Sequence, residues 1–354
     1  MDYLFKVLLS GYHEILEYLS AHVLTCLVPA FFIAGGIAVV VSTGAVLKYF
    51  GPTTKKYISY GVASVSGTVL AVCSCTVLPL FAGIYRKGAG LGPAVTFLFA
   101  GPAINLLAIV LTARKLGFDL GAGRAIGAVL FSIIIGLIMA AVFRKEEQAK
   151  AQAAESASGF AAGIDDEGKP AGQLLAFFGI QVAILVIGTA QVTLVTKLGV
   201  IVALLVALGV VLVKWFSKEE VKDWLIETFK LVKLIFPILL VGVFVAGALK
   251  VIIPEQWIAA SVGGNGILAN LIASVVGALM YFSTLTEVPI VKMLVDLGMG
   301  RGPALALLLA GPALSLPNML VVRNVIGTKK TLVYVGTVVL TATVVGYLFG
   351  WLVG

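Results

Sequence analysis

The sequence predicts an all-α, polytopic membrane protein of about ten transmembrane helices, arranged as two four-helix repeats with proline-broken helices. Three observations carry this prediction: an apolar composition, a series of long charge-free runs, and a duplicated segment rich in glycine and proline. Of the 354 residues, 60% are hydrophobic and 12% are charged, and the mean hydropathy is +1.10. Soluble domains are about half apolar and about a quarter charged, so the composition excludes a soluble core.

The charge and the cysteine count exclude further classes of protein. The net charge of +8 fits Lys and Arg in short loops that face the cytoplasm. These basic residues are not grouped with exposed aromatic residues, so no nucleic-acid partner is expected. Three cysteines, Cys26, Cys73 and Cys75, are too few for a secreted disulfide framework. The first apolar run is too long for a cleavable signal peptide, so it is expected to insert as a transmembrane segment.

The helices are predicted from runs that can cross about 30 Å of hydrocarbon, which takes roughly 20 helical residues. Helices are favoured over strands because every backbone polar group in lipid must find a partner within its own segment. Before these runs, residues 1–20 carry apolar side chains at helical spacing and predict a short interfacial helix. The ten runs are 23–47, 57–85, 88–113, 125–143, 171–196, 198–213, 234–249, 256–286, 302–322 and 331–354.

The chain divides at residues 144–170, which are rich in Ala, Gly, Ser and charges of both signs and have no large apolar face. They predict a cytoplasmic linker. Residues 1–143 then hold the interfacial segment and repeat one, residues 171–227 a two-helix spacer and loop, and residues 228–354 repeat two. With ten crossings, 14 of the 25 Lys and Arg residues lie on the side of the N-terminus, which favours cytoplasmic termini.

The repeat is visible as a gapless self-match. Residues 76–106 align with residues 286–316 at a shift of 210 positions, and 13 of the 31 positions are identical, including most glycines and prolines. Internal duplication is typical of secondary transporters, whose binding site lies between the repeats. With ten helices, the chain crosses the membrane an even number of times between equivalent helices. Equivalent helices then run in the same direction, which indicates a parallel repeat. One helix more or fewer would reverse the second repeat and make it inverted.

Four prolines mark the expected breaks: Pro79, Pro102, Pro289 and Pro312. A proline inside a helix lacks an N–H and leaves the carbonyl four residues earlier without its partner. In the hydrocarbon region, such carbonyls are tolerated only where they face protein or a polar cavity. Because the breaks lie at matched distances from the helix connections, they predict one central cavity. The alternative is a set of ordinary proline kinks.

The segment CSCTVLP (73–79) holds two thiols just before a predicted break. On a regular helix, Cys73 and Cys75 point about 200° apart and cannot share a ligand, whereas in an unwound segment they converge. Thiolates bind soft acceptors such as Cu(I), Zn(II) or trivalent arsenic. No metal site is assigned, and the alternative is two small buried apolar residues. The second repeat has Ser283 and Leu285 at these positions, so the thiols belong to one repeat only.

Glu287 is the first charged residue after a long charge-free run and lies two residues before Pro289. Intramembrane carboxylates are costly and usually functional, so we expect Glu287 to bind a coupling proton or ion. The alternative places it at an aqueous helix end near Lys292. The expected substrate-binding residues surround the breaks: Cys73, Cys75, Thr76, Pro79, Gly101, Pro102, Asn105, Ser283, Thr284, Thr286, Gly311, Pro312, Ser315 and Asn318.

The stretch CSCTVLPLFAGIYRKGAGLGPAVTFLFAGPAIN (73–105) and its echo GPALSLPN (311–318) resemble a predicted permease family of the ArsP type. The resemblance covers most of the chain. It implies a multi-pass permease of the cytoplasmic membrane, with export of trivalent organoarsenicals as the activity characterised in the family. Cys73 and Cys75 match the family's cysteine motif, which implies that they contact the substrate. Many relatives have no established substrate, so the arsenical does not transfer directly.

The sequence therefore predicts a secondary permease that exports a small soft or thiol-reactive solute through a cavity between two repeats. No enzyme activity and no cofactor are expected. The expected partners are the solute and membrane lipids, and a homo-oligomer is left open. One alternative is an intramembrane thiol oxidoreductase, which normally needs a second accessible thiol pair. The other is a channel or a structural membrane subunit.

Overall fold

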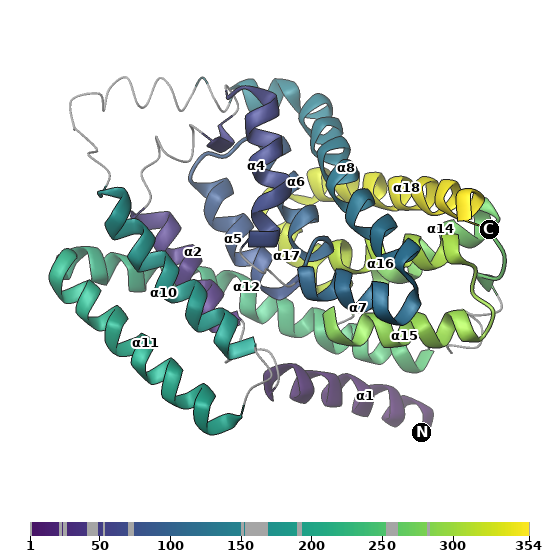
Figure 1. Ribbon diagram of the computed structural model, residues 1–354, viewed down its shortest axis with the longest axis horizontal. Coiled ribbons are helices and arrows are strands. Elements are labelled where there is room, and N and C mark those ends of the chain that lie inside the picture. The colour runs from purple at the N-terminus through teal and green to yellow at the C-terminus, as the bar shows by residue number, and fades with distance from the viewer. Residues whose placement is uncertain are drawn as a thin grey trace.

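The computed structural model describes residues 2–20, 23, 27–40, 49–51, 54–69, 74–149, 152, 169–189, 193–252, 261–281 and 284–353 (Figure 1). These residues form helices and no extended strand; the one bridge between described residues joins Gly263 to Met299. In chain order the helices are α1 (Asp2–Tyr18), α2 (Val28–Val40), α4 (Lys56–Val69), α5 (Ser74–Arg86), α6 (Leu91–Ala103), α7 (Leu106–Leu116), α8 (Phe118–Val142), α10 (Ala171–Thr189), α11 (Leu194–Trp215), α12 (Lys218–Ile252), α14 (Ile267–Leu279), α15 (Thr284–Asp296), α16 (Arg301–Leu314), α17 (Leu316–Ile326) and α18 (Thr328–Val353).

Four of these helices are long and apolar enough to cross a membrane alone: Phe118–Val142, Val195–Trp215, Lys218–Val245 and Thr328–Val353. Two bent pairs raise the number to six among the described residues. They join Leu91–Ala103 to Ala108–Leu116 at 47° and Arg301–Leu314 to Leu316–Ile326 at 46°. The predicted all-helical, multi-pass architecture is confirmed at this level, while the count of ten spans stays a prediction.

The difference arises because several predicted runs are divided between two shorter helices. The run 57–85 is shared by α4 and α5, and the run 256–286 by α14 and α15. The runs 88–113 and 302–322 each contain one of the bends. Hydropathy shows where the chain is apolar but carries no signal for where an apolar helix stops and restarts.

We refer to α4–α8 as the first series and to α14–α18 as the second series. Their helices begin 210 or 211 positions apart throughout: α5 at Ser74 and α15 at Thr284, α7 at Leu106 and α17 at Leu316. The turns agree as well. Gly88 and Gly298 have φ of 101° and 107°, and Gly117 and Gly327 have φ of 112° and 87°. A side chain is strained in this left-handed region, so glycine is required at both pairs of turns.

The centre of the molecule is made by α6 and α16, which contact each other and are buried along almost their whole length. A helix that is apolar on every face fits such a position. The two series interlock around this pair, because α5 contacts α17 and α7 contacts α15. Figure 1 shows α6, α16 and α17 inside the molecule, with α1 and α11 along its outer edges.

The prolines do not break the helices at their own positions, which corrects the sequence-based expectation. Pro79 and Pro289 are the sixth residues of α5 and α15, and both helices continue past them. At this position each proline removes one hydrogen bond, to the carbonyl of the second helical residue, Cys75 or Leu285, so the missing bond lies in the first turn and leaves the rest of the helix intact. Pro102 and Pro312 lie in the last turns of α6 and α16, directly before the bends.

The periphery consists of helices that pack on one face only. Helix α1 lies along α12, where the Ser10 hydroxyl donates to the Gly247 carbonyl at 2.8 Å, while Phe5 on its outer face is 66% exposed. The hairpin α10–α11 is anchored through Phe177 and Trp224, and the Trp224 indole donates to the Phe32 carbonyl at 2.8 Å. Residues 144–149 are helical, so helical structure extends into the predicted linker.

Candidate functional site

A single arginine fixes the bend between α6 and α7. Arg124 lies one turn and a half into α8, and its guanidinium is fully buried. Its Nε donates to the carbonyl of Ala103, the last residue of α6, at 3.4 Å, and its Nη1 donates to the Thr112 hydroxyl of α7 at 3.3 Å. Since the two acceptors lie on opposite sides of the bend, one planar donor group ties the half-helices together.

The third partner of Arg124 comes from the other series. Its Nη2 donates to Oε2 of Glu287 at 3.0 Å, and the two side chains are 0% and 1% exposed. Glu287 occupies the first turn of α15, where the positive end of the helix dipole favours a carboxylate. Its second oxygen, Oε1, is buried and has no hydrogen-bond partner within the described part of the chain.

This ion pair is costly for the protein to maintain. Burying two charges removes their hydration, and attraction between them compensates fully only when the remaining polar atoms are also bonded. Here the guanidinium has three acceptors, but one carboxylate oxygen has none. A pair of this kind is better explained by function than by stability.

The second series has a neutral group at the equivalent place. Tyr334 of α18 lies 210 positions after Arg124, is fully buried, and donates from its hydroxyl to the Ala313 carbonyl at 3.2 Å. Ala313 lies 210 positions after Ala103, so both side chains cap the same carbonyl at the end of α6 or α16. A tyrosine is therefore sufficient to hold such a helix end. The charge of Arg124 is needed only for Glu287.

The predicted residues of the second bend lie at the junction of α16 and α17. Ser315 separates the two helices with a φ of 27°, is 1% exposed, and its hydroxyl has no hydrogen-bond partner among the described residues. The Asn318 amide donates to the Pro312 carbonyl at 3.4 Å. Gly311 and Pro312 are buried.

The predicted residues of the first series are placed in part. Thr76 and Pro79 are buried in α5, Gly101 and Pro102 are buried at the end of α6, and Asn105 is half-buried at the bend. Two predicted residues, Cys73 and Ser283, lie outside the described residues. For Cys75, Thr284 and Thr286 the structure describes only the backbone, at the starts of α5 and α15.

The sequence reasoning found Glu287 but missed Arg124. Arg124 directly precedes the run 125–143 and so lies outside the predicted helix, whereas α8 begins six residues earlier, at Phe118. A usable signal was present in the glycines around it. A Cβ on Gly121 would contact Ala113 of α7, and a Cβ on Gly127 would contact Leu309 of α16, so this stretch of α8 is closely covered. A lone arginine among glycines at the start of an apolar helix is better interpreted as buried.

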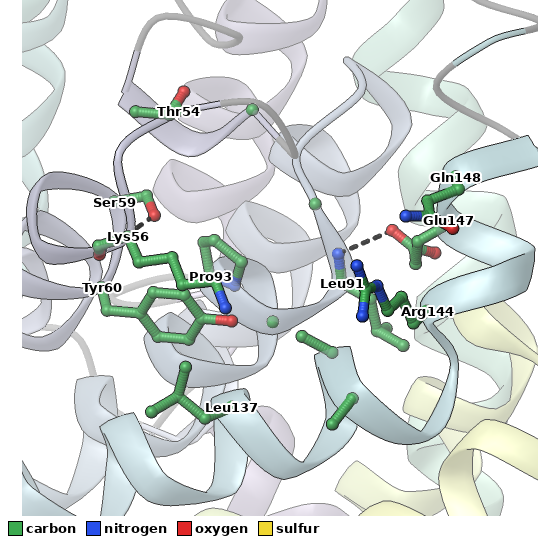
Figure 2. A pocket seen from close by; sticks show the side chains of 15 residues that line it. Thr54, Lys56, Ser59, Tyr60, Leu91, Pro93, Leu137, Arg144, Glu147 and Gln148 are labelled. Carbon is green, nitrogen blue, oxygen red and sulfur yellow. Dashed lines mark hydrogen bonds between the residues drawn. The ribbon is translucent and has the colours of Figure 1, made fainter.

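A separate cavity of roughly 500 Å³ lies where α4 and α6 begin and α8 ends, and sequence analysis did not predict it (Figure 2). Lys56 and Tyr60 line one side, and Arg144 and Glu147 the other. The Glu147 carboxylate accepts from the Leu91 N–H at the start of α6 at 2.9 Å and pairs with Lys330 of α18 at 3.5 Å. No group of three or more His, Cys, Asp or Glu that could hold a metal ion occurs among the described residues.

Comparison with known proteins places the chain in a family. Residues 8–351 match the profile of a family described as predicted permease. The chain is 48% identical over 362 aligned residues to UPF0718 protein MJ0584 of Methanocaldococcus jannaschii, covering 99% of this chain and 98% of that protein. It is 24% identical over 282 residues to UPF0718 protein YraQ of Escherichia coli, covering 78% of this chain and 63% of that protein. No solved structure matches the chain.

A permease spans the membrane, and the long apolar helices of this structure fit such a protein. The family profile extends over nearly the whole chain, and the archaeal relative is similar along its full length. Neither relative's name states a substrate. The chain belongs to the predicted permease family of the ArsP type, and it is a multi-pass membrane transporter.

Proposed function

We propose that this permease is a secondary transporter of the cytoplasmic membrane that exports a small soft or thiol-reactive solute. Trivalent organoarsenicals, soft metal ions and reactive sulfur compounds form this class. The observation that carries the proposal is the pair of bent helices, α6–α7 and α16–α17, which bend by 47° and 46° at corresponding positions. In secondary transporters, substrate and coupling-ion sites lie where interrupted helices of two repeats meet.

The proposal includes two repeats related by the shift of 210 positions. The agreement of helix starts and of left-handed glycines between the two series supports it. Residues 1–143 and 228–354 then form the repeats, and residues 171–227 the spacer between them. The sequence contains no GxxxxGK[ST] motif, so the energy for transport is expected from an ion gradient or a separate subunit.

The two halves of the proposed site have different chemistry. Cys75 lies at the start of α5, which contacts α17, and Cys73 precedes this helix in the sequence. The two thiols supply soft ligands. Glu287 stands at the start of α15, which contacts α7, and supplies a group for a proton or cation. The equivalent residues are Ser283 and Leu285 for the thiols and Val77 for Glu287, so each function belongs to one series only.

The test is transport of a trivalent organoarsenical into inside-out membrane vesicles, with a non-thiophilic solute of similar size for comparison. We expect accumulation by the wild-type protein and its loss in the double variant Cys73→Ser, Cys75→Ser. Cys26→Ser is the matched control, because it removes a thiol from another apolar run. Full transport by the double variant would remove the thiols from the mechanism.

A second measurement separates a carrier from a channel. Vesicles preloaded with unlabelled solute should take up labelled solute faster than empty vesicles, because a carrier returns loaded from the opposite side. A channel shows no such acceleration. An equal rate in both kinds of vesicle would therefore contradict the carrier mechanism.

A further inference from the structure

Arg124 makes more contacts than capping a helix end requires. At the equivalent position, the uncharged Tyr334 hydroxyl donates one hydrogen bond to the Ala313 carbonyl. Arg124 donates a hydrogen bond to the Ala103 carbonyl and donates two more, to Thr112 and Glu287. Its two additional bonds reach α7 and α15, at the place where α7 meets the opposite series.

We propose that Arg124 and Glu287 form a proton-operated contact between the two series: protonation of Glu287 breaks the ion pair and lets α15 separate from α7 and α8. Arg124 is a positioning residue in this step. The inference rests on the proposed transport function and identifies its coupling ion as a proton.

The proton has a defined place to bind. Oε2 of Glu287 is held by Arg124, whereas Oε1 is buried without a partner among the described residues. A proton from the aqueous phase adds to the carboxylate, forms one O–H bond and leaves Glu287 neutral. When the pair forms again, that proton leaves to the other side, and Arg124 keeps its charge throughout.

Protonation then drives opening by electrostatics. Once Glu287 is neutral, the guanidinium keeps the Ala103 and Thr112 oxygens as acceptors but has no counter-charge in a buried site. An uncompensated buried charge is strongly unfavourable. A conformation that admits water to Arg124 relieves this cost, so the proton state of Glu287 selects between a closed and an open contact.

The other charged groups on the neighbouring helices do not compete for Glu287. On α15 itself, Lys292 pairs with Asp296 at the exposed end of the helix. Arg301 of α16 pairs with Asp119 of α8, and Arg114 and Lys115 are exposed at the end of α7. Arg124 is the one ion-pair partner that Glu287 has in the described part of the chain.

Hydrogen exchange on the full-length protein in lipid nanodiscs, at one fixed pH and without solute, tests the contact itself. Glu287→Gln imitates the protonated state, so amides of residues 106–116 and 284–296 should exchange at least tenfold faster than in the wild type. The double variant Arg124→Gln, Glu287→Gln removes the unbalanced charge and should exchange as the wild type does. Tyr334→Phe is the matched control: it removes a helix-end hydrogen bond without changing a charge, and it should raise exchange in both segments much less than Glu287→Gln does.

Two results would overturn the proposal: wild-type exchange in Glu287→Gln, or exchange in the double variant as fast as in Glu287→Gln. If Glu287→Gln does not fold, recovery of folded protein by the double variant supports the same charge-balance argument, and failure of both variants overturns it.

In vesicles, Glu287→Gln should lose at least tenfold in arsenical accumulation driven by a proton gradient while keeping solute exchange at equal pH. Loss of both overturns the coupling role. If the wild type moves no solute, the transport proposal fails, and hydrogen exchange alone decides on the ion pair.

Discussion

Replacing Arg124 by methionine tests whether the buried ion pair is held by charge balance. The substitution keeps an unbranched side chain of similar length but leaves the Glu287 carboxylate buried without a partner. Breaking a buried pair from one side costs about 3–5 kcal/mol, because the remaining charge keeps its desolvation penalty. We therefore expect Arg124→Met to lower the free energy of unfolding by about that amount.

The double variant Arg124→Met, Glu287→Met should recover part of the loss, since apolar replacement of both members of a buried pair is often neutral. It should remain about 1–3 kcal/mol less stable than the wild type, because the Ala103 carbonyl loses its donor. The coupling energy of the resulting double-mutant cycle should reach about 3 kcal/mol or more. Tyr334→Phe is the neutral reference: it removes the one bond to the Ala313 carbonyl and should cost about 1–3 kcal/mol.

The assay is reversible unfolding of the purified protein in bicelles, followed by steric trapping or by denaturant titration. Five proteins are compared under one condition, so that differences in free energy are meaningful: the wild type, Arg124→Met, Glu287→Met, the double variant and Tyr334→Phe. If Arg124→Met lowers the free energy of unfolding no more than Tyr334→Phe does, the charge of Arg124 contributes nothing to stability beyond capping the helix end. If the double variant costs the sum of the single variants, the two residues are energetically independent and the reasoning fails.

Two further predictions concern packing and backbone conformation. Gly136→Ala should lower the free energy of unfolding by about 1–3 kcal/mol, because the new Cβ would overlap the Thr96 hydroxyl of α6 and lie 2.7 Å from the Gly92 carbonyl. Gly179→Ala, where nothing lies within 4 Å, is its control and should not destabilise the protein; thermal unfolding of both variants measures the difference. Ser315→Gly should stabilise the protein by about 1 kcal/mol, since glycine adopts the φ of 27° without strain; a lower melting temperature would show that the Ser315 side chain contributes more than its backbone costs.

Much of the fold could be predicted from sequence because the signals are local. Helices follow from apolar runs in a medium that offers backbone groups no other partner. The shift of 210 positions, found over residues 76–106, agrees with helix starts and left-handed glycines well outside that stretch. Glu287 was identifiable because a carboxylate at the end of a long charge-free run is expensive wherever the helix lies.

The division of the long runs could not be predicted in this way. The run 57–85 reads as one helix but is shared by α4 and α5, and Pro79 lies within α5 rather than at its start. An apolar segment satisfies lipid equally well as one helix or two. Where it stops depends on which neighbours accept its free carbonyls, as Arg124 does for Ala103 and Tyr334 for Ala313.

The sequence alone determined that the chain is apolar and helical, that residues 76–106 match residues 286–316, and that two thiols and a carboxylate lie just before prolines. Only the tertiary structure decided that Glu287 pairs with Arg124, that the pair bridges the two series, and that Tyr334 replaces it in the second. The physical reason lies in burial. A cation at the end of an apolar run reaches water in one arrangement of neighbouring helices and is enclosed in another, and the glycines of α8 here let α7 and α16 close around it.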